Sequence, residues 1–183
     1  ISLEQTRRSQ LLNGQYISNS RSFRKGARVQ ELVREGVLHP AMASLIPFET
    51  IYGHQERAIR AIHAGRTPLI STGTGSGKTE CFIYPIISRC LQLRDEGAAA
   101  GILAVLIYPM NALAEDQLGR LRDLLAGTGI TFGMYVGKTP EEAGEVAGRR
   151  LPAGSSRESY RRELAKAQAE RRGTAVHPAE ERC

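Results

Sequence analysis

The chain has 183 residues, enough for one domain with a sizeable hydrophobic core or for such a domain with an appendage. Its formal net charge of +6 favours a polyanionic partner, although the basic side chains are scattered along the sequence. The longest apolar run, residues 102–107, is too short to span a membrane and no signal peptide is visible, so we expect a cytoplasmic protein. The three cysteines have neither metal-ligand spacing nor an even count, which argues against a disulfide framework.

Residues 1–45 are predicted to form an N-terminal extension whose first half is polar and basic. Within it, a short amphipathic helix is predicted over residues 27–35, because apolar side chains recur on one face and a glycine follows. Phe23 is placed to pin this arm to the domain, but a solvated extension without a binding role is an equally good interpretation. The basic side chains of the arm are Arg7, Arg8, Arg21, Arg24 and Lys25.

Residues 46–140 have the pattern of repeated α/β units. Right-handed helical crossovers between parallel strands predict a doubly wound parallel sheet flanked by helices, with ligands bound at the carboxyl ends of the strands. Residues 102–107 are uniformly apolar, as expected for a central strand that is covered on both faces. The expected elements are a helix over 54–64, a strand over 68–71, a helix over 80–94, a strand over 102–107, a helix over 111–126 and a strand over 130–136.

Residues 141–183 change in composition and are rich in arginine, glutamate and alanine. A capping box that begins at Ser155 predicts a helix to about Arg172. Its inward stripe is thin, so we expect the helix to lie on the surface or to project, within a charged helical insertion that is free to move. The residues of that stripe are Tyr160, Leu164 and Ala167.

A glycine-rich loop of sequence TGTGSGKT, residues 72–79, ends the short apolar strand and opens the next helix. Glycines let successive N–H groups point at phosphate oxygens, and the helix N-terminus favours the same anion. Lys78 is expected to supply charge for the β- and γ-phosphates and Thr79 to hold Mg²⁺, so these two are the catalytic candidates of the chain. An ordinary glycine-rich turn is the alternative. The expected phosphate-binding residues are Thr74, Gly75, Ser76, Gly77, Lys78, Thr79 and Glu80.

Over residues 37–140 the chain resembles the first lobe of a superfamily 2 DEAD/DEAH-type helicase. The segment YGHQERAI, residues 52–59, resembles the Q-motif, and this resemblance implies that Gln55 reads the adenine base of ATP. The alternative is a solvated glutamine at a helix start. DEAD-box proteins also have an aromatic residue about seventeen positions earlier, where this chain has Leu38, which argues against a strict DEAD-box protein.

The segment YPMNALAEDQ, residues 108–117, resembles helicase motif Ia in its RecQ-like form. The resemblance implies that the start of the next helix contacts a nucleic-acid phosphate, with Asn111 as the N-cap. The nucleic-acid-binding residues expected in this motif are Pro109, Met110 and Asn111.

The segment YVGKTP, residues 135–140, resembles the next backbone-contacting motif of these helicases. Gly137 permits close approach of a phosphate, while Lys138 and the hydroxyl of Thr139 contact it. A capped turn without a ligand is the alternative interpretation of this segment.

The acidic strand end that holds Mg²⁺ and positions the attacking water in such helicases is missing. Asp95-Glu96 follows a helix, Glu115-Asp116 lies inside one, and Glu180-Glu181 is expected in a polar tail. The chain also starts with Ile1 rather than Met. We therefore expect a partial RecA-like P-loop domain from a longer polypeptide, inactive by itself because the DEAH motif and the second lobe are absent.

The P-loop and motif Ia sequences most resemble those of large bacterial helicases of anti-phage defence systems such as DISARM and Druantia, in which a charged insertion also follows the Gly-x-Thr-Pro motif. The predicted function is that of an ATP-dependent DNA helicase or translocase. Its expected partners are DNA with single-stranded character, the second lobe of the same polypeptide and other defence proteins. The alternatives are a nucleic-acid-binding module that uses ATP as a conformational ligand, and a P-loop ATPase that is not a helicase.

Overall fold

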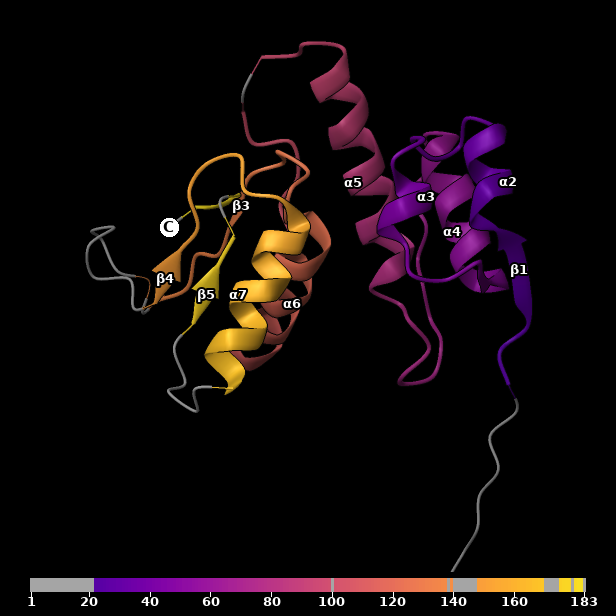
Figure 1. Ribbon diagram of the computed structural model, residues 1–183. Helices are drawn as coiled ribbons and strands as arrows, with labels where there is room; N and C mark the ends of the chain where they lie inside the picture. The colour runs from indigo at the N-terminus through magenta and orange to yellow at the C-terminus, as the bar shows by residue number, and fades with distance from the viewer. Residues whose placement is uncertain are drawn as a thin grey trace, which may run out of the picture.

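The structure is a computed structural model of an α/β chain, shown in Figure 1. The elements are numbered as they appear there. The residues that it describes are 22–99, 101–137, 139, 148–169, 175–178 and 180–182.

The N-terminal part consists of a two-stranded antiparallel sheet and short helices. Strand β1 (Lys25–Arg28) pairs with β2 (Thr50–Tyr52), and α2 (Val29–Arg34) and α3 (Met42–Leu45) lie between them in the chain. The predicted helix over residues 27–35 is therefore confirmed in part, because its first residues belong to β1.

Two longer helices follow and pack against this part. Helix α4 (Gly53–His63) contacts α5 (Glu80–Asp95), which follows the P-loop. Residues 29–46, expected in an extension, bury side chains in the same core as α5, because α2 and α3 have no other apolar surface to cover. The core residues are Val29, Leu32, Leu38, Met42, Leu45, Ile46, Ile51, Ile59, Ile83, Tyr84, Ile87, Leu91 and Leu125.

The C-terminal part has a helix pair and very short strands. Helix α6 (Asn111–Leu125) packs against α7 (Arg157–Ala169), side by side in Figure 1. Of the two placements expected for the charged helix, lying on the surface or projecting, these residues adopt the first, because Tyr160 is only 3% exposed. A small second core forms there. It contains Ala126, Leu151, Tyr160 and Val176, with Leu164 and Ala167 packed against them.

Parallel pairing in this part joins segments that are distant in the sequence. Strand β3 (Phe132–Gly133) pairs with β6 (Glu181–Arg182), and β4 (Arg149–Arg150) pairs with β5 (Val176–His177). The predicted strand over residues 130–136 is thus reduced to β3. The parallel strands confirm a partial RecA-like α/β domain, although they lie in small two-stranded sheets.

Two apolar segments that were expected to be strands, the second of them at the centre of the sheet, are not strands. Residues 68–71 and 102–107 are without a strand partner in the part of the chain that the structure describes, and Leu69 and Ile107 are 97% and 89% exposed. A buried parallel strand needs a hydrogen-bonded neighbour on each edge, and an apolar sequence alone does not supply one. The prediction of a covered central strand is therefore wrong for this chain.

The acidic residues near the C-terminus are buried rather than part of a polar tail. Glu181 accepts hydrogen bonds of 2.6 and 2.7 Å from Arg122 of α6, and His177 lies 3.0 Å from the same carboxylate. Glu180 accepts from the backbone N–H of Gly127 over 2.9 Å. The polar-tail prediction fails because these carboxylates find cationic and N–H partners on α6 and the loop after it.

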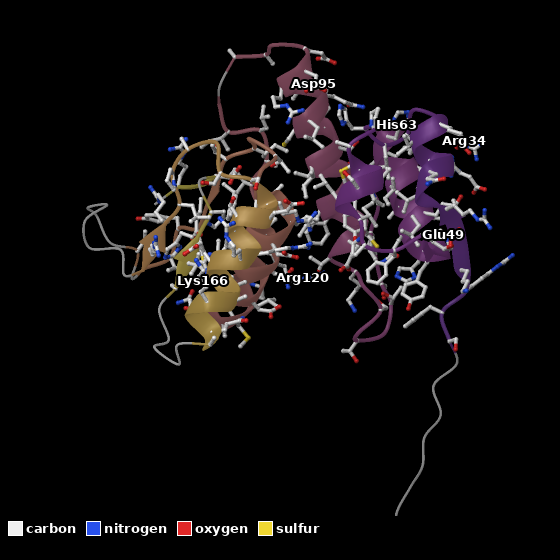
Figure 2. The ribbon with its side chains drawn as sticks, viewed as in Figure 1. Arg34, Glu49, His63, Asp95, Arg120 and Lys166 are labelled. Atoms are coloured by element: carbon white, nitrogen blue, oxygen red, sulfur yellow. The ribbon has the colours of Figure 1, made fainter. Side chains whose placement is uncertain are left out.

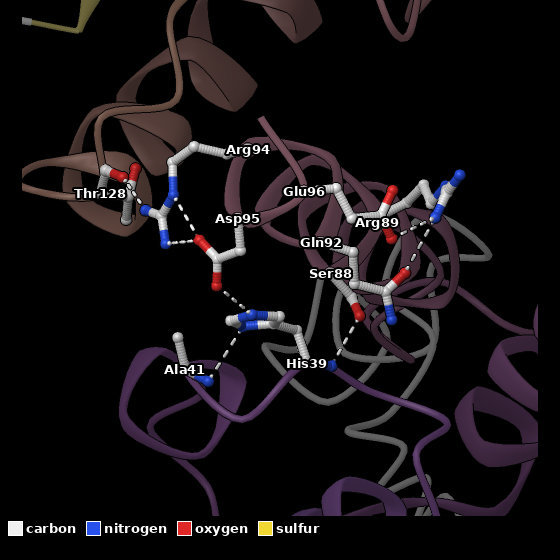
Figure 3. A network of polar contacts seen from close by, with 9 residues as sticks. All are labelled: His39, Ala41, Ser88, Arg89, Gln92, Arg94, Asp95, Glu96 and Thr128. Atoms are coloured by element: carbon white, nitrogen blue, oxygen red, sulfur yellow. Dashed lines mark hydrogen bonds and ion pairs between the residues drawn. The ribbon is translucent and has the colours of Figure 1, made fainter. Parts of the chain in front are cut away.

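A second polar network, shown in Figure 3, links the end of α5 to both parts of the molecule. Asp95 lies 2.9 Å from His39 Nε2 and accepts two hydrogen bonds from Arg94. Arg94 also donates to the carbonyl of Thr128 over 2.5 Å. The hydrogen bond from Arg94, followed by that from His39, lowers the pKa of Asp95. Among the described helices, none has the length and apolar character that a membrane crossing requires.

Candidate functional site: the P-loop pocket

The P-loop lies between an extended segment and α5, and two of its glycines have the left-handed backbone that glycine accepts readily. Gly75 has φ of 70° and Gly77 has φ of 75°. A Cβ atom at Gly77 would lie 2.5 Å from Gln55 Nε2 and 3.0 Å from Glu80 Oε2. Both the backbone angle and the close neighbours therefore require glycine at position 77.

The loop is closed by hydrogen bonds among its own residues. Lys78 Nζ donates to the carbonyl oxygens of Thr72 and Gly73 over 2.9 and 2.8 Å. The hydroxyls of Thr72 and Ser76 lie 2.6 Å apart, and Ser76 is 1% exposed. These contacts hold the ammonium group at the mouth of the loop, beside the first turn of α5.

Gln55 is a strut between α4 and the P-loop. Its Oε1 accepts from the Tyr52 N–H over 2.8 Å, and its Nε2 donates to the Gly77 carbonyl over 3.0 Å. Because Gln55 is only 5% exposed, the alternative of a solvated glutamine is wrong. The same amide that was predicted to read adenine thus positions the loop that is predicted to bind phosphate.

Three aromatic rings gather next to this strut. Phe23 lies 5.4 Å from Tyr52 and 5.6 Å from His54, measured between ring centroids, while Tyr52 and His54 are stacked at 5.7 Å. His54 Nε2 also lies 2.9 Å from the carbonyl of Ser76, which it reaches as a donor. Phe23 therefore packs beside the P-loop, and Phe23 and Tyr52 each remain more than one third exposed.

A pocket of about 460 Å³ opens at the P-loop and is shared with helix α6. Three side chains of α6 line this pocket, and none of them is among the residues predicted from sequence to bind the nucleotide. Their spacing along α6, at positions 116, 117 and 120, places them on one helical face, which is the signal that could have found them. The lining residues are Gly75, Ser76, Gly77, Lys78, Thr79, Glu80, Asp116, Gln117 and Arg120.

The charged wall of this pocket is an ion pair between the two helices. Arg120 Nη2 donates to Glu80 Oε1, and Arg120 Nη1 donates to Gln117 Oε1 over 3.2 Å. The Glu80 side chain is 13% exposed and that of Arg120 is 45% exposed. Burial, together with the charge of Glu80, raises the pKa of the Tyr84 hydroxyl to about 12. Tyr84 therefore stays neutral behind this wall.

The donor set fits a magnesium-bound triphosphate. The Thr79 hydroxyl is a hard oxygen ligand next to the Lys78 ammonium, as Mg²⁺ and phosphate require. Glu80 Oε2 is buried and, among the described residues, has no hydrogen-bond partner, so it is available to a metal-bound water. Within the same part of the chain, no three histidine, cysteine or acidic side chains cluster to hold a metal by themselves.

The predicted nucleic-acid contacts lie at the start of α6. The helix begins at Asn111 with Met110 as its N-cap, so the prediction of Asn111 as the cap is wrong by one position. The extended backbone of Met110 (φ −140°, ψ 138°) starts the helix there, and no side chain caps it. Met110 is 64% exposed, and the first-turn N–H groups of a helix have no partner within the helix, as an anion site requires.

The second predicted contact segment forms a turn. Thr139 accepts a hydrogen bond from the Val136 N–H at its hydroxyl over 2.7 Å and donates from its own N–H to the Val136 carbonyl over 2.9 Å. A Cβ at Gly137 would meet nothing within 4 Å, so a phosphate could approach it. Lys138 lies outside the described residues. This geometry fits the capped turn that was the alternative interpretation, and a phosphate contact stays a prediction.

Comparison with known proteins gives the family. The sequence pattern of the DEAD/DEAH box helicase family matches residues 52–152. The Druantia protein DruE of Escherichia coli (strain UMEA 4076-1) is 36% identical over 111 residues, which is 51% of this chain and 6% of that protein. The ATP-dependent helicase Lhr-Core of Methanothermobacter thermautotrophicus is 35% identical over 103 residues, which is 51% of this chain and 12% of that protein.

A third relative is named for RNA. The ATP-dependent RNA helicase has1 of Emericella nidulans is 36% identical over 90 residues, covering 49% of this chain and 15% of that protein. The chain thus spans a small part of the length of the curated relatives it matches, and no solved structure matches it. The P-loop, the Q-motif and motif Ia all fall in the matched region, and the chain belongs to the DEAD/DEAH box helicase family, within superfamily 2.

Proposed function

We propose that this chain is the ATP-binding part of an ATP-dependent DNA helicase or translocase that acts in bacterial anti-phage defence. The observation that carries this proposal is the pocket that the P-loop shares with α6, the helix of motif Ia. The proposed nucleotide site is then in direct contact with the helix that is proposed to bind nucleic acid. A motor requires such contact, because it links the binding of the two ligands. Support for a role in defence comes from the match to the Druantia protein DruE. The choice of DNA rests on the resemblance of residues 108–117 to the RecQ-like form of motif Ia.

In this proposal the residues have separate tasks. Lys78 and the P-loop N–H groups bind the β- and γ-phosphates, and Thr79 holds the Mg²⁺ that neutralises developing charge when it is bound. Gln55 holds the loop and discriminates adenine, with Tyr52 packing on the base. Pro109, Met110, Asn111, Gly137, Lys138 and Thr139 bind the backbone of a single strand. The free thiols Cys81 and Cys90 suit a reducing compartment such as the cytoplasm.

The test is titration with a fluorescent ATP analogue and Mg²⁺. Lys78→Ala is expected to weaken binding by about 1.5–3 kcal/mol, because a charge-assisted contact with phosphate is lost. Gln55→Ala is expected to reduce the preference for ATP over GTP. Equal analogue affinity of wild type and Lys78→Ala would overturn the proposal. Circular dichroism of each variant is the control for folding.

Turnover separates this proposal from a module that uses ATP as a conformational ligand. We expect the 183 residues alone to bind ATP without hydrolysing it at a measurable rate. In this proposal the acidic pair that places water lies outside these 183 residues, and the arginine finger, worth about 10³–10⁵ in rate, belongs to a second lobe. Asp116 does reach the pocket, but its carboxylate accepts a hydrogen bond of 2.9 Å from Gln117. DNA-stimulated phosphate release above the Lys78→Ala background would show that the catalytic acid lies in this chain.

A further inference from the structure

Arg120 links the P-loop helix to the middle of α6. Its guanidinium donates to Glu80 in the first turn of α5 and to Gln117 on its own helix. In Figure 2 the labelled Arg120 lies between α6 and the lower end of α5. Burial raises the pKa of Tyr108, the first residue of motif Ia, and the charge of Arg120 offsets part of that effect. The hydrogen bonds of Arg120 therefore join α5 to the helix that follows motif Ia.

The P-loop end of this link is tightly packed. Glu80 Oε2 lies 3.0 Å from the point that a Cβ on Gly77 would occupy, and Gln55 holds the Gly77 carbonyl on the other side. The carboxylate thus follows any displacement of Gly77. Since Glu80 is also hydrogen-bonded to Arg120, a shift of the loop changes the position of the guanidinium.

The other end of the link is the start of α6. Asn111 and Arg120 belong to the same uninterrupted helix, about 14 Å apart along its axis at ~1.5 Å per residue. A helix of this length transmits a shift as a rigid body, because its backbone hydrogen bonds are internal. A force on Arg120 therefore reaches the exposed Met110 and the first-turn N–H groups.

We propose that Arg120 is a positioning residue which, through Glu80, couples nucleotide binding at the P-loop to the placement of the nucleic-acid-binding start of α6. The inference rests on the proposed function, because it requires ATP at the P-loop and nucleic acid at α6. A triphosphate brings negative charge to the wall that already holds the Glu80 carboxylate, and Arg120 offsets that repulsion. Removal of either partner should then affect phosphate affinity to a different extent but the coupling alike.

The experiment measures binding and coupling together on the full chain. The dissociation constant of N-methylanthraniloyl-ATP with Mg²⁺ is measured with and without saturating oligo(dT), and that of labelled oligo(dT) with and without a non-hydrolysable ATP analogue. The two ratios must agree, and we expect about fivefold or more for wild type. Arg120→Ala and Glu80→Gln are each expected to bring the ratio to about one.

The nucleotide affinity of the same variants distinguishes a positioning role from a merely structural one. Arg120→Ala is expected to weaken binding of the ATP analogue several-fold, because the Glu80 carboxylate then repels the phosphates without an offsetting charge. Glu80→Gln should change this affinity less, because it removes the repulsion together with a contact to a metal-bound water. The double variant should show no further loss of coupling. Arg89→Ala is the matched control. Arg89 lies on α5, as Glu80 does, and forms an exposed ion pair of 3.7 Å with Glu96, the residue that follows this helix. Its ratio should equal that of wild type.

The outcomes separate the two levels of inference. Normal ATP and oligo(dT) binding with a coupling ratio that Arg120→Ala leaves unchanged overturns the role of Arg120 and spares the proposed function. A wild-type chain that binds both ligands normally but has a coupling ratio of one also overturns the role of Arg120 and spares the proposed function. A wild-type chain that binds no ATP overturns both. Arg120→Lys, which keeps the charge, should retain part of the coupling even where Arg120→Ala proves too unstable to measure.

Discussion

Each half of the molecule is stabilised internally by a different kind of interaction. The half before residue 100 surrounds α5 with a continuous apolar core, in which Leu32 and Ile59 are fully buried and to which α6 contributes Leu125. The half after it has a small apolar core and relies on charged contacts, above all those of Arg122 with Glu181. The stability of the first half should therefore fall when buried methyl groups are removed. The stability of the second half should depend on pH and on the charge of its side chains.

The difference follows from composition. In α4 and α5 apolar side chains recur at helical spacing, so burial of the apolar face of each helix stabilises this half directly. Residues after 140 have few large apolar side chains, and Tyr160 is the one that is best buried in α7. Paired charges stabilise such a region only while both partners stay ionised.

The largest effect is expected from removing a core side chain of the first half. Ile59→Ala should lower the free energy of unfolding by about 2–5 kcal/mol, because Ile59 is fully buried and a cavity remains. The same change at Ile107, which is 89% exposed, should have almost no effect. Urea unfolding followed by circular dichroism measures both. A similar loss at the two positions would mean that residues 102–107 are covered, as the sequence predicted.

That pair of isoleucines also shows what sequence can and cannot specify. The helices predicted over 54–64, 80–94 and 111–126 are found at Gly53–His63, Glu80–Asp95 and Asn111–Leu125. Their signals are local, since each helix makes its own backbone hydrogen bonds. The apolar segment over 102–107 carries an equally clear pattern, but a strand forms only when a second segment pairs with it.

The candidate site divides in the same way. The P-loop was predicted because its chemistry is written in consecutive residues, and Gln55 because a family motif marks it. Arg120 was missed because its contact with Glu80 joins residues forty positions apart. The burial of Glu181 was missed for the same reason, since Glu181 lies in β6 and its partner Arg122 in α6, 59 positions earlier.

The second half is tested by the carboxylate of Glu181. Burial raises its pKa, but the hydrogen bonds from Arg122 and His177 outweigh that effect and lower the pKa below its ordinary value of 4.5. Glu181→Ala should lower the free energy of unfolding by about 2–3 kcal/mol at pH 7, less than for a fully buried pair because Arg122 reaches solvent. Glu96→Ala, which breaks an exposed pair with Arg89, should change little.

The pH dependence of this effect has a definite sign. A carboxylate with a lowered pKa in the folded state stabilises the fold above its ordinary pKa, and the contribution disappears as pH falls through the lowered value. The gap between wild type and Glu181→Ala should therefore be full at pH 7 and shrink below about pH 4.5. A gap that stays constant down to pH 3 would mean that the charge of Glu181 does not contribute to stability.

The smallest effect on stability is expected where the two halves meet, at Gly77 of the P-loop. Gly77→Ala should lower the free energy of unfolding by about 1–2 kcal/mol, because an L-residue is strained at φ of 75°. The new Cβ would also displace Gln55 Nε2 from its contact with the loop. The loss in binding free energy of the fluorescent ATP analogue should be far larger than the loss in free energy of unfolding, since the loop N–H groups lose their alignment. Gly73→Ala is the matched control, because a Cβ there meets nothing within 4 Å. Equal ATP affinity for the two alanine variants would show that the strut from Gln55 to Gly77 does not shape the phosphate site.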